Sequence, residues 1–222
     1  MGDLPFGVSH ESAAQVAAKI RELQNQQIQI GVVIGGGNIF RGIQQKASWG
    51  MERTPADQVG MLATLMNGIV LHQALIHAGC EVRMMSALDC PTVAEKYQWE
   101  KAMRYLDKGR IVLFVGGTGH PYFTTDTTAA LRACEIHADI LLKATTRVDG
   151  IYDKDPRKES NAKKYLTITF QEILEKKLGI LDLSAVTMCM GANIPIRVFN
   201  FYEGSLLSTL SDNPQGTLVT MD

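Results

Sequence analysis

The stretch that decides the fold reads VVIGGGNIFRG and covers residues 32–42. A mostly apolar run, residues 28–34, leads straight into three glycines, which predicts a buried strand of a parallel sheet. Consecutive glycines let the backbone turn sharply and bring its N–H groups close to an anion. Arg41 adds a planar fork of donors that suits phosphate. A plain strand-to-helix turn with a solvated arginine explains these residues equally well.

Two common phosphate-binding motifs are excluded at this stretch. A P-loop needs a lysine and a serine or threonine after its last glycine, whereas Gly42 is followed by Ile43 and Gln44. The dinucleotide fingerprint G-x-G-x-x-G needs a glycine where Phe40 stands. The loop therefore belongs to neither fold.

The length and composition indicate one substantial hydrophobic core, and we expect residues 1–222 to form a single domain. The chain is 45% hydrophobic, and its net charge of −1 gives no general attraction to nucleic acid or an anionic membrane. Its four cysteines lie far apart without a C-x-x-C pair, which is typical of reduced thiols, and we expect no metal site. With no signal peptide, and with polar residues interrupting the apolar window 61–78, we predict a soluble cytoplasmic protein.

Helical and strand patterns alternate along the chain. Predicted helices cover residues 9–27, 55–79, 92–106, 127–137, 170–177 and 184–191, and further strands cover 80–87, 110–115, 140–144 and 194–199. This alternation predicts a mainly parallel sheet covered by helices on both faces, a three-layer α/β/α sandwich, with the ligand beyond the carboxyl ends of the strands. In helix 55–79, Val59, Leu62 and Met66 form one apolar stripe, and we expect Met66 to pack in the core.

A second glycine loop, GGTGHPYFTTD, covers residues 116–126. Threonine hydroxyls and the flat faces of Tyr122 and Phe123 suit a nucleobase. Asp126 leads into a helix, where it could simply complement the helix dipole. Asp57, at the start of helix 55–79, could do the same or could accept from ribose hydroxyls. Residues 143–156 mix polar and aromatic groups suited to an adenine edge, although an exposed turn explains them equally well.

Several motifs together resemble the bacterial uridylate kinases of the amino acid kinase family. They are VVIGGGNIFRG, DQVGMLATLMNG, GTGHPYFTTDT, VDGIYDKDP and IPIRVFN, and the likeness runs over nearly the whole chain. The resemblance implies an enzyme of pyrimidine nucleotide biosynthesis that transfers the γ-phosphoryl of ATP, bound with Mg²⁺, to UMP. It also implies a homohexamer, activated by GTP through residues 2–7 and inhibited by UTP.

The resemblance also assigns roles to individual residues. UMP would be bound by Gly36, Asp57, Thr118, Gly119, His120, Pro121, Tyr122, Phe123, Thr124 and Thr125. ATP would be bound by Gly37, Arg41, Thr146, Tyr152 and Asp155, with Thr145 as the alternative to Thr146. Arg41, Asp126 and Asp182 would be the catalytic residues.

Two departures from the family pattern stand out. His120 replaces an expected asparagine. The family also begins with a strand ending in K-x-S-G-E, which this sequence lacks, so we expect the native protein to carry roughly 15–25 further residues upstream. A nucleotide- or oxyanion-binding protein without turnover is the rival function. An acyl-phosphate kinase is disfavoured by the GMLAT and FTTD stretches.

Overall fold

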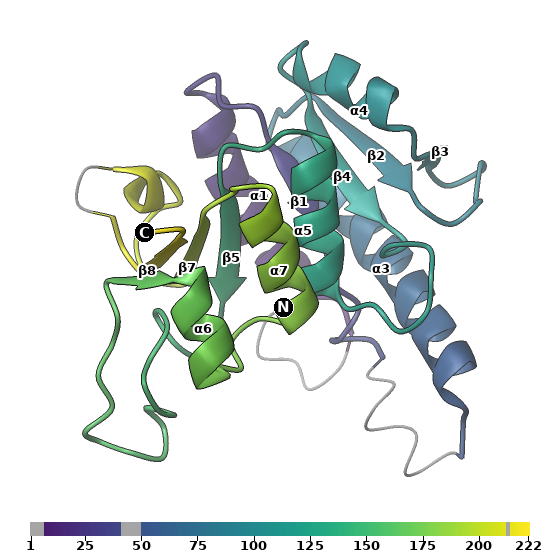
Figure 1. Cartoon of the computed structure of the whole chain (residues 1–222). Coiled ribbons are helices and arrows are strands. Elements are labelled where there is room, and N and C mark those ends of the chain that lie inside the picture. Colours follow the sequence, from purple (N-terminus) through teal and green to yellow (C-terminus); the bar gives the residue numbers. More distant parts are fainter. Residues whose placement is uncertain (1–6, 41–49, 212–213) are drawn as a thin grey trace. The chain divides into compact units, whose positions relative to one another are not determined.

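The computed structural model describes residues 7–40, 50–211 and 214–222, and the chain divides into two compact units. Unit 1 is Met1–Thr128 and unit 2 is Ala129–Asp222. Each unit contains one four-stranded sheet. The elements are labelled in Figure 1 and are described here unit by unit.

The sheet of unit 1 is parallel throughout, in the order β1-β4-β2-β3. Its strands are β1 (Gly31–Val33), β2 (Val82–Ser86), β3 (Glu95–Lys96) and β4 (Ile111–Val115). Every residue of β4 is buried, as expected for a central strand of a parallel sheet. Because β1 and β4 run in parallel, the two glycine loops that follow them leave the same edge of the sheet.

The helices of unit 1 are α1 (His10–Gln24), α3 (Arg53–His77) and α4 (Trp99–Leu106). The predicted N-cap Ser9 is confirmed, since its hydroxyl accepts from the Ser12 N–H. α3 packs on β2 and β4, and α1 packs on α3. A Cβ at Gly68 would lie 2.3 Å from Val115 Cγ1, so this glycine permits the close approach of α3 to β4.

Two sequence predictions in unit 1 are wrong. The helix predicted over residues 92–106 begins only at Trp99, because Glu95 and Lys96 pair with β2 as β3. The apolar stripe of α3 faces outward, with Met66 53% exposed, while small residues such as Ala63 and Gly68 face the sheet. α3 is long and apolar enough to cross a membrane by composition, but half of its most apolar window is buried in the protein.

Unit 2 contains β5 (Leu141–Thr145), β6 (Thr167–Thr169), β7 (Ile196–Asn200) and β8 (Thr217–Thr220), in the order β5-β7-β8-β6. Only the β7–β8 pair is antiparallel among these strands. Helices α6 (Phe170–Lys176) and α7 (Leu183–Gly191) pack on each other, and η1 (Leu207–Leu210) is a short 3-10 helix. The core is a cluster of buried apolar side chains that includes Ile151, Phe170 and Val198.

The helix α5 (Thr125–Glu135) starts in unit 1 and ends in unit 2.

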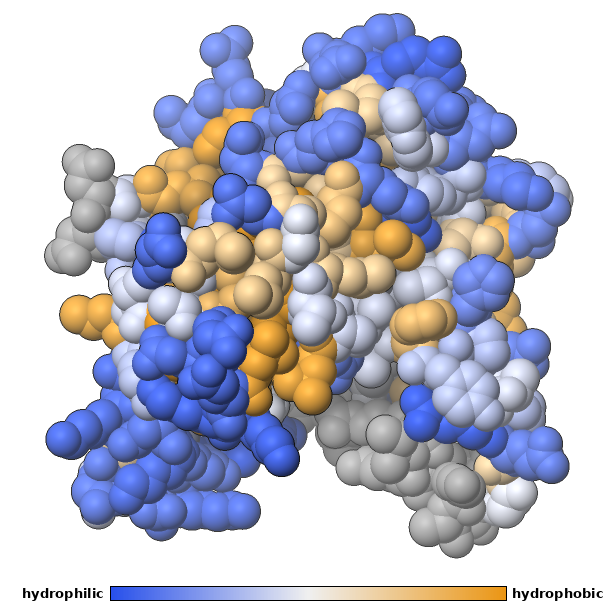
Figure 2. All heavy atoms as spheres, in the orientation of Figure 1, coloured by the Kyte–Doolittle hydropathy of each residue, from blue (hydrophilic) through white to orange (hydrophobic). Residues whose placement is uncertain are grey.

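The predicted α/β class and the mainly parallel strand pairing are confirmed by the strand order and register of the two sheets. Strand β6 was not anticipated from the sequence. Figure 2 shows that the surface at the lower left, where Figure 1 draws the loop between β5 and β6, is largely hydrophilic.

Candidate active site

The first glycine loop packs tightly on helix α3. Gly36 is buried, and a Cβ there would lie 2.6 Å from the Gly60 carbonyl oxygen and 2.8 Å from Ala63 Cβ. Ile39 and Phe40 both donate their N–H to the Gly36 carbonyl at 3.0 Å. Only glycine fits here, so the loop backbone itself forms the surface that a ligand would meet. Arg41, the predicted phosphate ligand, lies outside the described residues.

The second glycine loop, residues 116–123, is held to α3 at two points. The Gly116 N–H donates to the Thr64 hydroxyl at 2.7 Å, and the Tyr122 N–H donates to Asp57 Oδ2 at 2.8 Å. Tyr122 has a φ of 73°, a left-handed conformation that is costly for a residue with a side chain. The Asp57 carboxylate therefore stabilises a strained turn, and its role is larger than the helix-dipole reading allows.

Arg53 completes this contact and was not predicted from the sequence. Its Nε donates to Asp57 Oδ2 at 3.0 Å, and its guanidinium carbon lies 5.0 Å from the centre of the Tyr122 ring. A cation over an aromatic face stabilises the ring position. The aromatic rings of Tyr122 and Phe123 remain largely exposed beside this pair, available to a flat ligand.

Threonines form the start of α5, directly after the aromatic pair. The Thr124 hydroxyl accepts from the Thr127 N–H at 3.3 Å, a capping bond at the N-terminus of the helix. Asp126 lies in the first turn of α5, where its charge complements the helix dipole. A Cβ on Gly35 would lie 3.0 Å from Thr125 Oγ1. The structure thus brings the two glycine loops and Asp57 together in unit 1.

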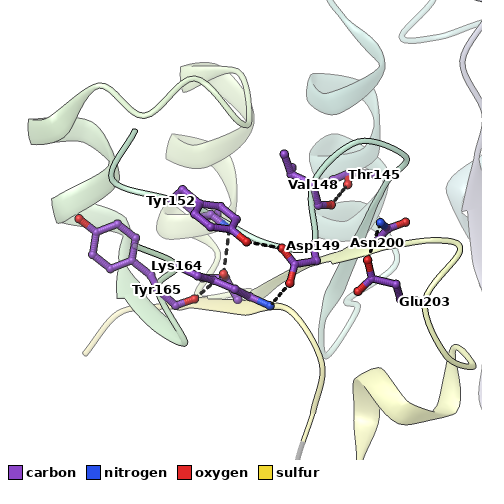
Figure 3. Close-up of polar contacts among 10 residues, drawn as sticks. Thr145, Val148, Asp149, Tyr152, Lys164, Tyr165, Asn200 and Glu203 are labelled. Atoms are coloured by element: carbon purple, nitrogen blue, oxygen red, sulfur yellow. Dashed lines mark hydrogen bonds and ion pairs between the residues drawn. The ribbon is translucent and has the colours of Figure 1, made fainter. Parts of the chain in front are cut away.

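In unit 2, Asp149 is the centre of a polar network after strand β5 (Figure 3). Its carboxylate accepts from the Tyr152 hydroxyl at 2.6 Å and from Lys164 Nζ at 2.6 Å. Burial opposes ionisation of Asp149, but the hydrogen bonds from Lys164 and Tyr152 outweigh it and lower the pKa of the carboxyl group. The hydrogen bond to Asp149, together with burial, raises the pKa of Tyr152 to about 12.

The buried threonine Thr217 fixes the same loop from β8. Its hydroxyl accepts from the Ile151 N–H at 2.8 Å and donates to the Tyr165 carbonyl at 2.5 Å. A Cβ on Gly150 would lie 2.5 Å from Thr217 Oγ1 and 2.8 Å from Lys164 Cε. The backbone of residues 149–152 is therefore closely constrained, and Tyr152 has a fixed position.

The other predicted residues of unit 2 make different contacts. Thr146 is exposed in the turn after β5, where the Thr145 hydroxyl donates to the Val148 carbonyl (Figure 3). Asp155 accepts three hydrogen bonds from Arg157, which lower the pKa of its carboxyl group. Asp182 is the N-cap residue of α7.

Comparison with known proteins identifies the family of this chain. Residues 6–200 match the model of the amino acid kinase family. The chain belongs to the amino acid kinase family. It is 54% identical to the uridylate kinase of Protochlamydia amoebophila over 99% of this chain and 88% of that protein. It is 47% identical to the uridylate kinase of Magnetococcus marinus, over 99% of this chain and 90% of that protein.

Solved structures within the amino acid kinase family agree. The UMP kinase from Bacillus anthracis superposes with a TM-score of 0.95 at 33% identity, over 99% of this chain and 91% of that one. The UMP kinase from Ureaplasma parvum gives a TM-score of 0.90 at 33% identity, over 96% and 90% of the two chains. The resemblance seen in the sequence motifs is thereby confirmed, as is its placement among nucleoside monophosphate kinases.

The sequence reading missed five residues that shape the two sites. They are Arg53, Thr64, Asn67, Asp149 and Lys164. Asn67 could have been predicted from the sequence, because an asparagine within an apolar helical face is buried only if it has hydrogen-bond partners. No local pattern points to Lys164, since its contact with Asp149 depends on the isolated antiparallel bridge between Tyr152 and Lys164.

Proposed function

We propose that this protein catalyses transfer of the γ-phosphoryl group of ATP to UMP, giving UDP and ADP. The observation that carries this is the arrangement of two loops in unit 1. The glycine loop has no room for a side chain at Gly36, and it leaves the same edge of the sheet as the loop that bears Tyr122 and Phe123. Backbone N–H groups suit a phosphate, and exposed aromatic faces suit a base. The identity with uridylate kinases over nearly the full chain supports UMP as the acceptor.

Different residues bind UMP and ATP in this proposal. Gly36 and residues 118–125 bind UMP, and Asp57 Oδ1 is the oxygen available for the ribose once Oδ2 has accepted from Tyr122 and Arg53. Tyr152, Thr146 and Asp155 bind the adenosine of ATP, while Gly37 and Arg41 bind its phosphates. Phosphoryl transfer in line needs positioning and charge neutralisation more than covalent catalysis.

In this proposal Mg²⁺ is bound together with ATP. Mg²⁺ bound with a nucleotide is usually held by substrate phosphate oxygens, water and one or two carboxylates. Bound there, the ion would neutralise phosphate charge. Asp126 and Asp182 would orient the phosphate-binding groups.

A coupled assay with ATP and each nucleoside monophosphate tests the function. We expect UMP to be the preferred acceptor. Turnover of CMP or GMP as fast as UMP would overturn the acceptor assignment, and UMP binding without formation of UDP would favour the rival, a nucleotide-binding protein.

Assembly, regulation and location are proposed from the family resemblance. Five large apolar side chains of α3 are exposed, which supports contact between copies in a homohexamer: Val59, Leu62, Met66, Ile69 and Ile76. Light scattering of the wild type and of Leu62→Glu tests this, since a charge in an apolar interface should reduce the particle mass. GTP activation, UTP inhibition and a cytoplasmic location are tested by effector titration and cell fractionation.

A further inference from the structure

Two asparagine side chains under the first glycine loop form a reciprocal amide pair. Asn67 Nδ2 donates to Asn38 Oδ1 at 2.6 Å, and Asn38 Nδ2 donates to Asn67 Oδ1 at 3.0 Å. Each Nδ2 also donates to a backbone carbonyl, Asn67 to Gly35 at 2.7 Å and Asn38 to Gly7 at 2.8 Å. The carbonyls fix both amide orientations, because turning either amide over would set an oxygen against an oxygen.

Burying a polar side chain such as that of Asn67 is unfavourable unless the side chain forms hydrogen bonds. Asn67 is 1% exposed and lies in the interior of α3, among side chains that pack against the sheet. An apolar residue of similar size would occupy this position without any need for hydrogen bonds. The Asn67 side chain instead donates two hydrogen bonds and accepts one, with Gly35 and Asn38 of the glycine loop as partners.

The contact with Gly35 sets the direction of the next N–H group. The peptide between Gly35 and Gly36 is trans, so its carbonyl and its N–H point in opposite directions. Since the Gly35 carbonyl turns toward Asn67 on α3, the Gly36 N–H turns away from the helix. Gly36 lies close to the helix on this side, since an added Cβ would lie 2.6 Å from the Gly60 carbonyl oxygen and 2.8 Å from Ala63 Cβ.

We propose that Asn67, acting through Asn38 and Gly35, is a positioning residue that aims the Gly36 N–H at the phosphate of the acceptor nucleotide. This inference rests on the proposed function for the identity of that phosphate. Asn38 extends the arrangement to Gly7, whose N–H donates back to the Asn38 carbonyl at 3.1 Å. The loop is thereby held from the helix on one side and from residue 7 on the other.

The decisive variant is Asn67→Leu, which keeps the size of the side chain and removes its hydrogen bonds. We expect kcat/KM for UMP to fall by about 10²-fold, the cost of a small misplacement of a reacting group, with little change in KM for ATP. The matched control is Ala74→Gly on the same helix, which lowers stability through helix propensity without touching the loop. It should leave the UMP parameters unchanged.

Asn67→Asp gives a second readout that a structural role would not produce. Its carboxylate would face two acceptors, the Gly35 carbonyl and Asn38 Oδ1, and would bind UMP poorly while ionised. Protonation restores one donor, so UMP affinity of the folded variant, measured by calorimetry, should rise relative to wild type as the pH falls. If Asn67→Leu does not fold, this pH series decides.

Three results would overturn the inference. The first is wild-type kcat/KM for UMP in Asn67→Leu, and the second is a rise in KM for ATP in that variant as large as the fall in kcat/KM for UMP. The third is a UMP affinity of Asn67→Asp that changes with pH no differently from that of wild type. Turnover of UMP by the wild type is measured first. Its absence would count against the proposed function, whereas the comparison of UMP binding between variants decides the role of Asn67.

Discussion

The first glycine loop of unit 1 and the loop after β5 in unit 2, which we propose to bind the acceptor and the donor, are held in place by different chemistry. In unit 1 the glycine loop is fixed by neutral amides, Asn67 and Asn38, and by direct contact with α3. In unit 2 the loop after β5 is fixed by an ionised carboxylate, Asp149, between Lys164 and Tyr152. Neutral hydrogen bonds are indifferent to pH and salt, whereas an ion pair at the surface responds to both. These two loops should therefore lose their structure under different conditions.

The largest expected effect is that of Gly36→Ala. Its Cβ would lie 2.6 Å from the Gly60 carbonyl oxygen, so the loop must move away from α3. We expect a loss of about 10²-fold in kcat/KM for UMP and a loss of about 1–3 kcal/mol in the free energy of unfolding.

A matched control for this substitution is Gly191→Ala, where a Cβ meets nothing within 4 Å. That variant should retain activity and unfold at the same or a higher temperature. Wild-type kinetics in Gly36→Ala would mean that the glycine is needed for neither packing nor phosphate binding.

Asp57→Asn should have the next largest effect. The substitution weakens a charge-assisted hydrogen bond to the strained Tyr122 turn and a ribose contact, so KM for UMP should rise by about tenfold with little change in kcat. Steady-state kinetics with UMP as the varied substrate measures this. An unchanged KM with a reduced kcat would move Asp57 from binding to chemistry.

On the donor side, Asp149→Asn should raise KM for ATP a few-fold and leave KM for UMP unchanged. The variant also has a spectroscopic signature, because the carboxylate is the main reason that the pKa of Tyr152 is raised to about 12. Ultraviolet titration should show one tyrosine moving back toward the ordinary value of 10.0. No shift in the titration would exclude Asp149 as the partner that holds the phenol.

The smallest effect is expected for Lys164→Met, since both partners of its ion pair are partly exposed. The pKa of Asp149 is lowered in the folded protein, so the ion pair stabilises the folded state fully at pH values above the unfolded pKa of 3.8. This contribution is lost as the pH falls through the lower pKa of the folded state. The stability of wild type should therefore fall more steeply with decreasing pH than that of Lys164→Met, and wild type should begin to unfold at a pH no higher than that of the variant.

Chemical denaturation at several pH values measures this difference. We expect less than about 1 kcal/mol at neutral pH, reduced further by salt. Asn67→Leu provides the contrast, because its loss of stability relative to wild type should not vary with pH. Equal pH dependence in both variants would remove the distinction between the two sides.

The sequence predicted both glycine loops because glycine is required locally, by tight turns and close approach. It also predicted α1 through its N-cap Ser9 and the α/β order through the alternation of apolar patterns. It failed where distant pairing decides: residues 95–96 join the sheet only because β2 lies beside them. Likewise, Asn67 and Asp149 acquire their roles from partners far along the chain, which no local pattern specifies.

The outward stripe of α3 shows a further limit of periodicity. The spacing of Val59, Leu62 and Met66 correctly indicates a helix but does not say which face is buried. Here close packing requires small residues, and Gly68 and Ala63 face the sheet and the loop. The placement of Arg41 remains a prediction from sequence, since it lies outside the described residues.

Helix α3 holds the two acceptor loops at alternating points of one face. Asp57 binds the second loop, Gly60 and Ala63 touch the first, Thr64 binds the second again, and Asn67 binds the first. The loops are therefore ordered together when the helix folds, and their conformational entropy is lost at that stage, before any nucleotide arrives. The amide protons of Gly116 and Tyr122, which donate to side chains of α3, should exchange with solvent deuterium as slowly in the free protein as in the nucleotide complex.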